Sequence, residues 1–488
     1  MKPLGKIIFF LVYLSSTFIN SQTSTLISFT NPGTGYTLSG NVVTIISDGT
    51  YELTGSETNK QIIISSSATL ILNSFTLINT NTLTPLIINA NNIVKLNLTG
   101  ESTFQDYSTN ENTGVIYLRS SSSLTIGGKG TLNINPNKSM AIYGITGTSL
   151  NVNDGANIKI SSSLSTIGGI YVLGIITFNN AIFTHNCPNG RYSAIYVQGD
   201  VYIIKGTYNI SSGRGLGINC EGNLYLGQNN GNNSVLILDI NSSNDGIEAK
   251  NMEVSSGIIN INSGEEGINI DGPNDICDNN IRCAGNCACS LTFKKGNLTL
   301  NSREDGINAN GDITFSGGNI VIFAYGGNDA NPIEQDGRLS ITGGNIIAAG
   351  TARNARVYAT TTQKAKTYSG TVNIGDRVEI FSKNNNNEIF GLITNRAANS
   401  IYFNFPEEFR VKINNIDITT TNSSNYNNGN RNGYYDDDDD YDDYFDDDYD
   451  DYDDYFDDDD DDDIIRYKLG NNLKLLNTLL IILSLLLI

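Results

Sequence analysis

The chain has 488 residues, and its 51 acidic and 30 basic side chains give a formal net charge of −21. Residues 436–463 hold 21 Asp, so this one run carries the whole net charge and the rest of the chain sums to zero. Without a basic excess, the composition excludes a typical nucleic-acid-binding protein.

The N-terminus predicts export from the cell. Lys2 and Lys6 precede the apolar run 7–12, and small residues follow at 15–21, which is the layout of a cleaved signal peptide over residues 1–22. Seven Asn-X-Ser/Thr sequences predict N-glycosylation if the host glycosylates, although several would arise by chance in so Asn-rich a chain. They begin at Asn97, Asn137, Asn209, Asn232, Asn241, Asn297 and Asn422.

An isoleucine then returns in phase through the middle of the chain. The positions are Ile116, Ile142, Ile170, Ile195, Ile218, Ile247, Ile268, Ile307 and Ile333. Most are followed two residues later by a small or apolar side chain, which is the pattern of a strand that faces a core. The intervals vary from 21 to 39 residues while the phase is kept, as expected for one turn of a solenoid with loop insertions.

Further alternating pairs follow each isoleucine, such as Leu124 with Ile126 and Leu132 with Ile134. Glycine pairs between them supply the backbone conformations that tight corners need. Three short strands per repeat predict an all-β parallel β-helix of about eleven coils. An antiparallel sandwich or a propeller also has short strands and frequent turns, but the in-phase isoleucine column favours the solenoid.

The pattern divides the body into three parts. We expect an N-terminal cap over residues 23–55, the parallel β-helix over residues 56–354, and a C-terminal β cap or small module over residues 355–420. Longer alternating strands after Gly350 mark the last boundary.

The C-terminal segments predict a surface anchor. Residues 421–470 include the Asp run, interleaved with Tyr and Phe, and so much charge predicts a disordered, extended stalk. The alternative, weak capture of divalent cations by the carboxylates, is less favoured. Residues 471–488 end in the mostly apolar run 475–488, which would make a helix of only about 21 Å, short of a membrane core of about 30 Å. Replacement by a GPI anchor is favoured over a short tail anchor, which predicts a secreted protein held at the cell surface.

Six cysteines in an exported chain predict oxidation. Four of them lie in the longest insertion and predict two local disulfides of undetermined pairing, a reading favoured over a zinc site. These are Cys277, Cys283, Cys287 and Cys289. Cys220 falls in the inward column and is expected in the core, with Cys187 as a potential partner.

Oxygen-bearing side chains recur at fixed phase on the later repeats. The candidates are Asp245, Glu266 and Asp305 before the isoleucine, and Glu248, Asn308 and Asp271 after it. If the coils stack in register, like charges one coil apart repel by roughly 3 kcal/mol at an effective dielectric of 20. Calcium suits such a column because it accepts many oxygen ligands in adaptable geometry. The alternative is that these residues are turn formers that bond their own backbone.

The stretches 244–249, 265–270 and 304–312 resemble the repeats of the calcium-containing β-helix carbohydrate-binding proteins first recognised in a cellulolytic clostridium. The resemblance covers roughly residues 190–350. It implies a right-handed parallel β-helix similar to pectate lyases, with calcium between coils and affinity for acidic polygalacturonate and also cellulose. Glu266 departs from the usual Asp of the family, and the earlier coils lack the acidic doublet.

We therefore expect a non-catalytic carbohydrate-binding protein with no catalytic residues. Tyrosines after the repeat isoleucines are candidates for contact with sugar rings, or a structural ladder; they are Tyr117, Tyr143, Tyr171 and Tyr196. A polysaccharide lyase on the same scaffold is the alternative, but Arg191, Arg214, Arg303 and Arg338 are scattered in phase. A structural or adhesive surface protein is the third possibility. The single histidine, His185, is expected at the surface.

Overall fold

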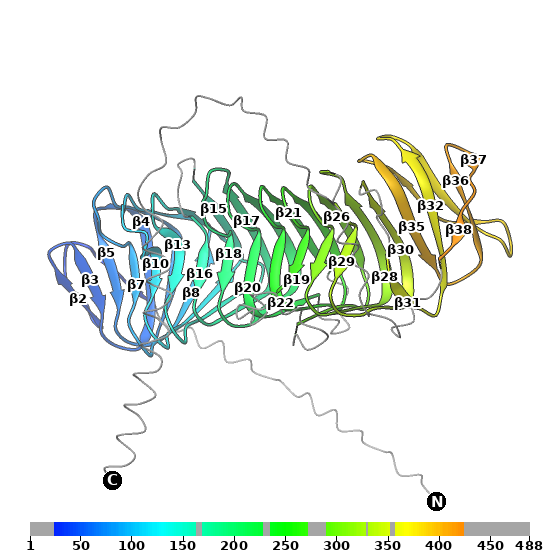
Figure 1. The fold of residues 1–488 in the computed structure, drawn as a ribbon. Helices are drawn as coiled ribbons and strands as arrows, with labels where there is room; N and C mark the ends of the chain where they lie inside the picture. Colours follow the sequence, from blue (N-terminus) through cyan, green and yellow to red (C-terminus); the bar gives the residue numbers. More distant parts are fainter. Residues whose placement is uncertain are drawn as a thin grey trace, which may run out of the picture. The chain divides into compact units, whose positions relative to one another are not determined.

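The computed structural model describes residues 24–162, 168–227, 235–271, 289–327, 330–351 and 357–423. All regular elements in these residues are β strands, and they wind into a parallel solenoid of about eleven coils (Figure 1). The sequence prediction of an all-β parallel β-helix is therefore confirmed. None of the described residues forms a helix that could span a membrane.

The first face of the solenoid carries the repeat isoleucines. Its strands pair in parallel, one per coil, and each repeat isoleucine is at most 3% exposed. The strands are β3 (Val42–Ile45), β5 (Gln61–Ile64), β7 (Leu86–Ile88), β10 (Gly114–Leu118), β13 (Met140–Gly144), β16 (Ile170–Val172), β18 (Ile195–Val197), the starts of β20 (Ile218–Leu226) and β22 (Ile247–Val254), β24 (Ile268–Ile270), β27 (Ile307–Ala309) and β29 (Ile333–Gln335).

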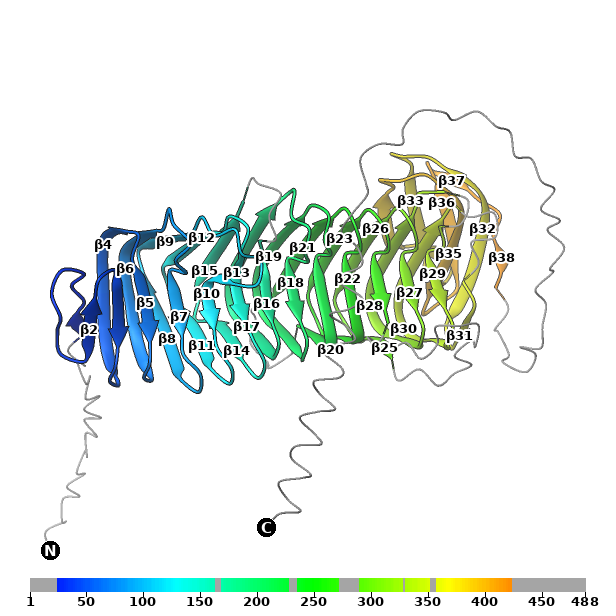
Figure 2. The same ribbon diagram turned by 60° about the vertical axis from the view of Figure 1, so that its left-hand side comes forward.

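The second and third faces are often the two halves of one bent strand. The second face contains β8 (Ile93–Thr99), β11 (Ser123–Gly128), β14 (Ser149–Asn153), β25 (Ser290–Phe293) and β31 (Ala359–Thr361). The third contains β9 (Glu101–Gln105), β12 (Thr131–Asn135), β15 (Asn157–Ser161), β21 (Leu236–Ser242), β23 (Ile258–Ser263) and β26 (Asn297–Ser302). Strands that run through both faces are β4 (Gly49–Thr58), β6 (Ala68–Ile78), β17 (Ile175–Cys187), β19 (Val201–Ser212), β28 (Asp312–Ala324) and β30 (Leu339–Gly350). Figure 2 shows the successive coils from another side.

Both ends of the solenoid are covered, which protects strand edges that would otherwise pair with other chains. At the N-terminal end, β1 (Thr25–Leu26) pairs with β4, and β2 (Tyr36–Ser39) forms an antiparallel hairpin with β3. At the other end, β35 (Ala398–Phe405) pairs antiparallel with β30 and with β32 (Lys364–Val372), which also pairs with β38 (Thr421–Asn422). A second sheet contains β33 (Arg377–Ser382), β34 (Glu388–Ile393), β36 (Phe409–Ile413) and β37 (Ile416–Asp417).

The interior is one long apolar core with a few polar exceptions. The expectation that His185 lies at the surface is wrong: it is 2% exposed, and its ring nitrogens face the carbonyl oxygens of Gly168 and Ser211. Cys187 and Cys220 are buried free thiols, and burial raises the pKa of each to about 12. Thiols that stay protonated and buried are unreactive, so these two serve as core residues.

Candidate functional site

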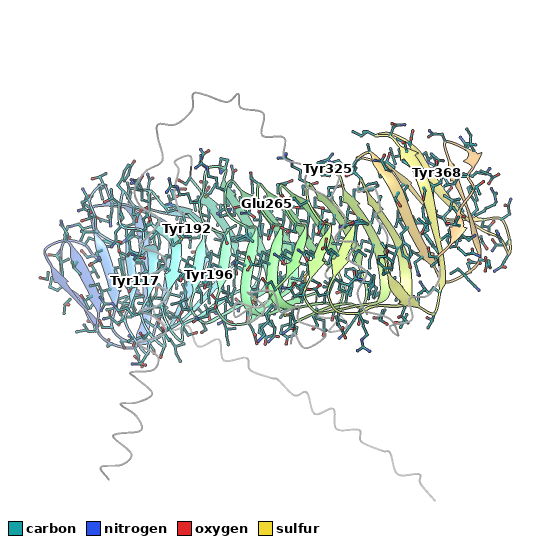
Figure 3. All side chains as sticks on the ribbon, viewed as in Figure 1. Tyr117, Tyr192, Tyr196, Glu265, Tyr325 and Tyr368 are labelled. Atoms are coloured by element: carbon teal, nitrogen blue, oxygen red, sulfur yellow. The ribbon has the colours of Figure 1, made fainter. Side chains whose placement is uncertain are left out.

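One outward column on the first face unites most of the candidate ligands. Strand pairing places its members side by side on consecutive coils. In order they are Ile87, Tyr117, Tyr143, Tyr171, Tyr196, Asn219, Glu248, Asn269, Asn308 and Glu334. The column therefore begins as an aromatic ladder and continues as a line of amides and carboxylates, with Tyr117 and Tyr196 marking the ladder ends in Figure 3.

The four tyrosine rings form a continuous ladder that is stacked from Tyr143 to Tyr196 and tilted between Tyr117 and Tyr143. Ring centroids are 5.7 Å apart for Tyr117 and Tyr143, 5.1 Å for Tyr143 and Tyr171, and 4.5 Å for Tyr171 and Tyr196, the last two pairs at 12° between planes. The faces of the two inner rings are therefore covered by their neighbours. A sugar that approaches the ladder meets ring edges and hydroxyl groups, so we expect hydrogen bonds there instead of flat stacking.

Removal of one inner ring should weaken the solenoid. Tyr171→Ala deletes two stacking contacts on a half-buried face, and we expect a loss of roughly 1–3 kcal/mol in the free energy of unfolding. Urea denaturation followed by circular dichroism measures it. Tyr107→Ala, at a side chain that is 47% exposed, is the control and should change stability much less. Equal stability of both variants would show that the ladder is not structural.

The acidic turns lie just before the first-face strands β22, β24 and β27. Asp245 is 5% exposed; its Oδ1 accepts the backbone N–H of Glu266 at 3.0 Å, and its Oδ2 accepts the side-chain amide of Asn269 at 3.4 Å. Asp245, Glu265 and Glu266 offer oxygens that all lie within 4.8 Å of one another. Three carboxylates from two successive coils are thus brought to one place.

A similar arrangement follows two coils later. Asp305 is 9% exposed and accepts the backbone N–H of Asn331 at 2.7 Å, and the side-chain amide of Asn331 donates to Glu334 at 3.1 Å. Asp305 also shares a side-chain hydrogen bond with Glu334. The carboxylates therefore form two groups, one on the coils of β22 and β24 and the other on the coils of β27 and β29.

The buried carboxylates of Asp245 and Asp305 lie beside other carboxylates and have raised pKa values. Burial, with the hydrogen bond and charge of Glu266, raises the pKa of Asp245 to about 8. Burial and Glu334 raise the pKa of Asp305 to about 8. No Lys or Arg forms an ion pair with either carboxylate in the part of the chain that the structure describes. Without a bound cation, the Asp245–Glu266 pair and the Asp305–Glu334 pair must each hold a proton to relieve the repulsion between their two carboxylates.

The remaining predicted ligands lie around this centre. Burial and the charges of Asp271 and Glu221 raise the pKa of Glu248, which accepts the side-chain amide of Asn219 at 3.2 Å. Asp271 accepts the amide of Asn310 at 3.1 Å. Asn308 lies between Asn269 and Glu334 in the outward column. Glu265 was not among the ligands predicted from the sequence; its place directly before Glu266 in the acidic doublet was the signal that could have identified it.

Glycine makes the acidic turns possible. A Cβ atom at Gly267 would lie 2.2 Å from Cδ2 of Leu300 and 2.5 Å from the carbonyl oxygen of Gly306, and Gly246 and Gly306 are equally crowded. Only a residue without a side chain lets the turn approach the core side chains so closely. In the acid-glycine-isoleucine motif, the isoleucine therefore begins a buried strand, and the crowded glycine holds the acidic residue before it in a fixed position at the turn.

A family model described as a carbohydrate-binding domain-containing protein matches residues 39–232 and again residues 184–376. The chain belongs to this carbohydrate-binding family. The two matches together span the tyrosine ladder and all three acidic turns, so the carbohydrate-binding protein carries its candidate sites inside the family region. Searches among curated proteins and among solved structures found no match.

Other predicted sites of this carbohydrate-binding protein are only partly described. Asn209, Asn241, Asn297 and Asn422 are exposed, Asn97 and Asn137 are half-buried, and Asn232 lies outside the described residues. The amide of Asn137 donates to the carbonyl oxygen of Ser108 at 3.1 Å, so a glycan there would be attached to the nitrogen that makes this bond. Cys289 is buried in the core, while the other three cysteines of the insertion, the signal peptide and the C-terminal segments lie outside the described residues.

Proposed function

We propose that this carbohydrate-binding protein is a non-catalytic, exported receptor for plant cell-wall polysaccharide, chiefly acidic pectin, and that calcium takes part in binding. The observation that carries the proposal is the group of carboxylates from Asp245, Glu265 and Glu266. Asp245 is buried, Glu265 and Glu266 are half-buried, and none of the three has a cationic partner among the described residues. Family membership supports the carbohydrate ligand.

The residues fit calcium. Calcium–oxygen bonds measure about 2.3–2.6 Å, so two oxygens on one ion are at most about 5 Å apart. The 4.8 Å limit that encloses the three carboxylates agrees with this range. Asp245, Glu265 and Glu266 would hold the ion, and Asp305 with Glu334 would offer oxygens on the next two coils. Bound calcium would supply positive charge for the carboxylates of a uronate polymer.

The alternative of a lyase needs a base beside the reacting carbon. Of the four candidate arginines, Arg338 is held by Asp312 at 3.1 Å on the second face, away from the acidic turns of the first face. Arg191, Arg214 and Arg303 are exposed in different turns and none contacts the carboxylate group in the described hydrogen bonds. These positions favour binding over catalysis.

A retention experiment tests the proposal. The full chain is passed over immobilised polygalacturonate and over cellulose, with calcium and with a chelator, and ultraviolet absorbance of unsaturated uronate products is followed. We expect retention on polygalacturonate that needs calcium, without new absorbance. Asp245→Asn should reduce retention, whereas Asp154→Asn, an exposed carboxylate at another corner, should not. Rising absorbance would make the protein an enzyme, and no retention in any condition would contradict the carbohydrate proposal.

A further inference from the structure

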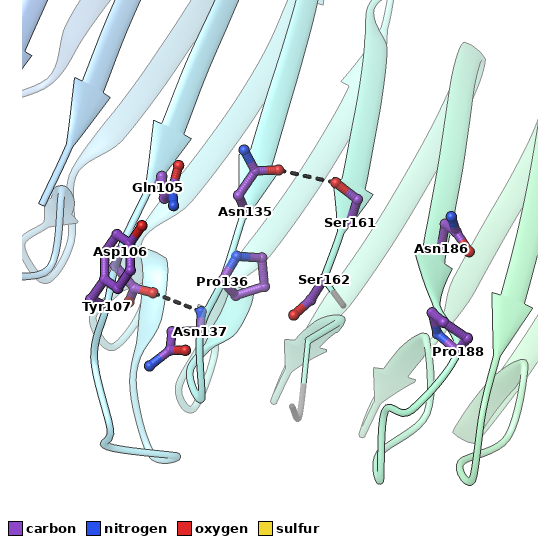
Figure 4. A pocket seen from close by; sticks show the side chains of 10 residues that line it. All are labelled: Gln105, Asp106, Tyr107, Asn135, Pro136, Asn137, Ser161, Ser162, Asn186 and Pro188. Carbon is purple, nitrogen blue, oxygen red and sulfur yellow. Dashed lines mark hydrogen bonds between the residues drawn. The ribbon is translucent and has the colours of Figure 1, made fainter. Parts of the chain in front are cut away.

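A polar groove runs along the third face of the solenoid. One cavity of about 570 Å³ is lined by residues from Gln105 to Pro188, and a second of about 460 Å³ is lined by residues from Pro188 to Tyr325. Pro188 belongs to both, so the two cavities follow each other along the same side of the molecule. Figure 4 shows the first, where Gln105, Asn135, Ser161 and Asn186 come from successive coils.

The base of the groove is a column in register. It contains Gln105, Asn135, Ser161, Asn186, Ser211, Asn241 and Asn262. Several members bond to one another between coils, including the hydroxyl of Ser161 to Asn135 at 3.1 Å and the amide of Asn262 to Asn241 at 3.0 Å. These bonds hold the amides and hydroxyls in fixed positions and leave further lone pairs and N–H groups for a ligand.

The spacing of this column suits a linear sugar chain. Neighbouring coils of a β-helix are about 4.8 Å apart, which is close to the advance of one pyranose in an extended 1,4-linked polysaccharide. A chain that lies along the groove would therefore meet an equivalent polar side chain with each sugar. A peptide or a nucleic acid has a different repeat and would not keep this register.

The two ends of the groove carry aromatic and cationic side chains. Tyr107, 47% exposed, lines one end, and Tyr325 and Arg303 line the other. The guanidinium group of Arg396 stacks over the ring of Tyr325 at 4.5 Å. Arg303 is exposed and forms no ion pair within the described ranges, so its guanidinium is available to a carboxylate. Gly264 also lines the groove, and the next residue is Glu265 of the acidic turn.

We propose that this groove is the binding track for a linear acidic polysaccharide, which lies parallel to the solenoid axis with one sugar per coil and a uronate carboxylate on Arg303. The inference rests on the proposed function and assigns its ligand to the third face, beside the acidic turns. The amide and hydroxyl column binds the sugar hydroxyls. Arg303 provides selectivity for acidic over neutral chains.

Blocking and charge-removal variants of the full chain test the track. Asn186→Trp places a large side chain where the two cavities meet, and we expect at least about a tenfold loss of affinity for soluble polygalacturonate by calorimetry. Asn179→Trp is the matched control, because Asn179 is an exposed Asn on the second-face part of the same strand, β17, and binding should be unchanged. Arg303→Gln should weaken polygalacturonate and leave binding of a neutral cello-oligosaccharide unchanged, with Arg338→Gln as its control.

The outcomes separate the two proposals. Wild-type binding that is lost in Asn186→Trp and kept in Asn179→Trp supports the track, provided that circular dichroism shows both variants folded. Wild-type binding that Asn186→Trp leaves intact overturns the track and leaves the proposed function standing. If Asn186→Trp does not fold, Arg303→Gln decides alone: an unchanged preference for the acidic chain overturns the proposal. Absence of wild-type binding contradicts the proposed function itself.

Discussion

Calcium is expected to raise the thermal unfolding midpoint of the full chain, and more at about pH 9 than at about pH 6. The reason is competition between calcium and protons for Asp245 and Asp305, whose pKa values are raised to about 8. Above about pH 8 both carboxylates are ionised and ready to bind a cation. At calcium one hundred times its Kd, stabilisation should reach about 2.7 kcal/mol. Differential scanning fluorimetry across pH, with calcium and with chelator, measures it.

The sign of the calcium-free pH dependence follows from the same shift. The folded protein keeps a proton on Asp245 that the unfolded chain, with an ordinary pKa of 3.8, has already released. Stability without calcium should therefore fall as pH rises from about 4 to about 8 and then level off. Stability that instead rises through this range would contradict the buried, unpaired carboxylates.

Two variants test whether the acidic turns cause the calcium response and the pH dependence of stability. Asp245→Asn removes one negative charge with little change in shape, so the calcium-free protein should become more stable above about pH 8 and the calcium response should shrink. Asp154→Asn keeps the acidic turns and should behave as the wild type. The same calcium response in all three proteins would place the cation elsewhere, for example on the acidic C-terminal run.

Gly267→Ala is expected to destabilise the protein by about 2 kcal/mol or more and to weaken calcium binding at the same time. Its new methyl group would lie 2.2 Å from Leu300 and 2.5 Å from the carbonyl oxygen of Gly306, so either the turn or the core strand must shift. Since Glu266 precedes Gly267 directly, such a shift also moves a carboxylate of the proposed calcium site. Urea denaturation and calcium titration by calorimetry measure the two effects.

Gly327→Ala provides the control for that substitution. Nothing lies within 4 Å of a Cβ atom at Gly327, so alanine should be tolerated with little change in stability or calcium affinity. If Gly267→Ala is as stable as Gly327→Ala, the close approach of coils at the acidic turn is not required. If it is less stable but binds calcium normally, the glycine serves the core alone.

Much of the fold can be predicted from local patterns because every coil of a solenoid repeats the same arrangement of strands and buried positions. The isoleucine column from Ile116 to Ile333 can be recognised from the alternation of apolar residues and the constant phase of the repeat alone. Each coil buries the same positions against the next. His185 was mispredicted because its neighbours suggested a turn, whereas β17 continues through that region and turns the ring inward. A local pattern cannot show where a strand bends or ends.

The sequence by itself determined the β-helix, its register and the columns in which Asp245, Glu266 and Asp305 recur, because these depend on periods that are visible along the chain. Only the tertiary structure decided which of these residues meet. It brought Glu265 to Asp245, covered the faces of the inner tyrosine rings, and aligned Gln105 with residues as distant as Arg303 along one groove. Such groupings depend on the lengths of intervening turns and on burial, which set distances between coils that no single stretch of sequence contains.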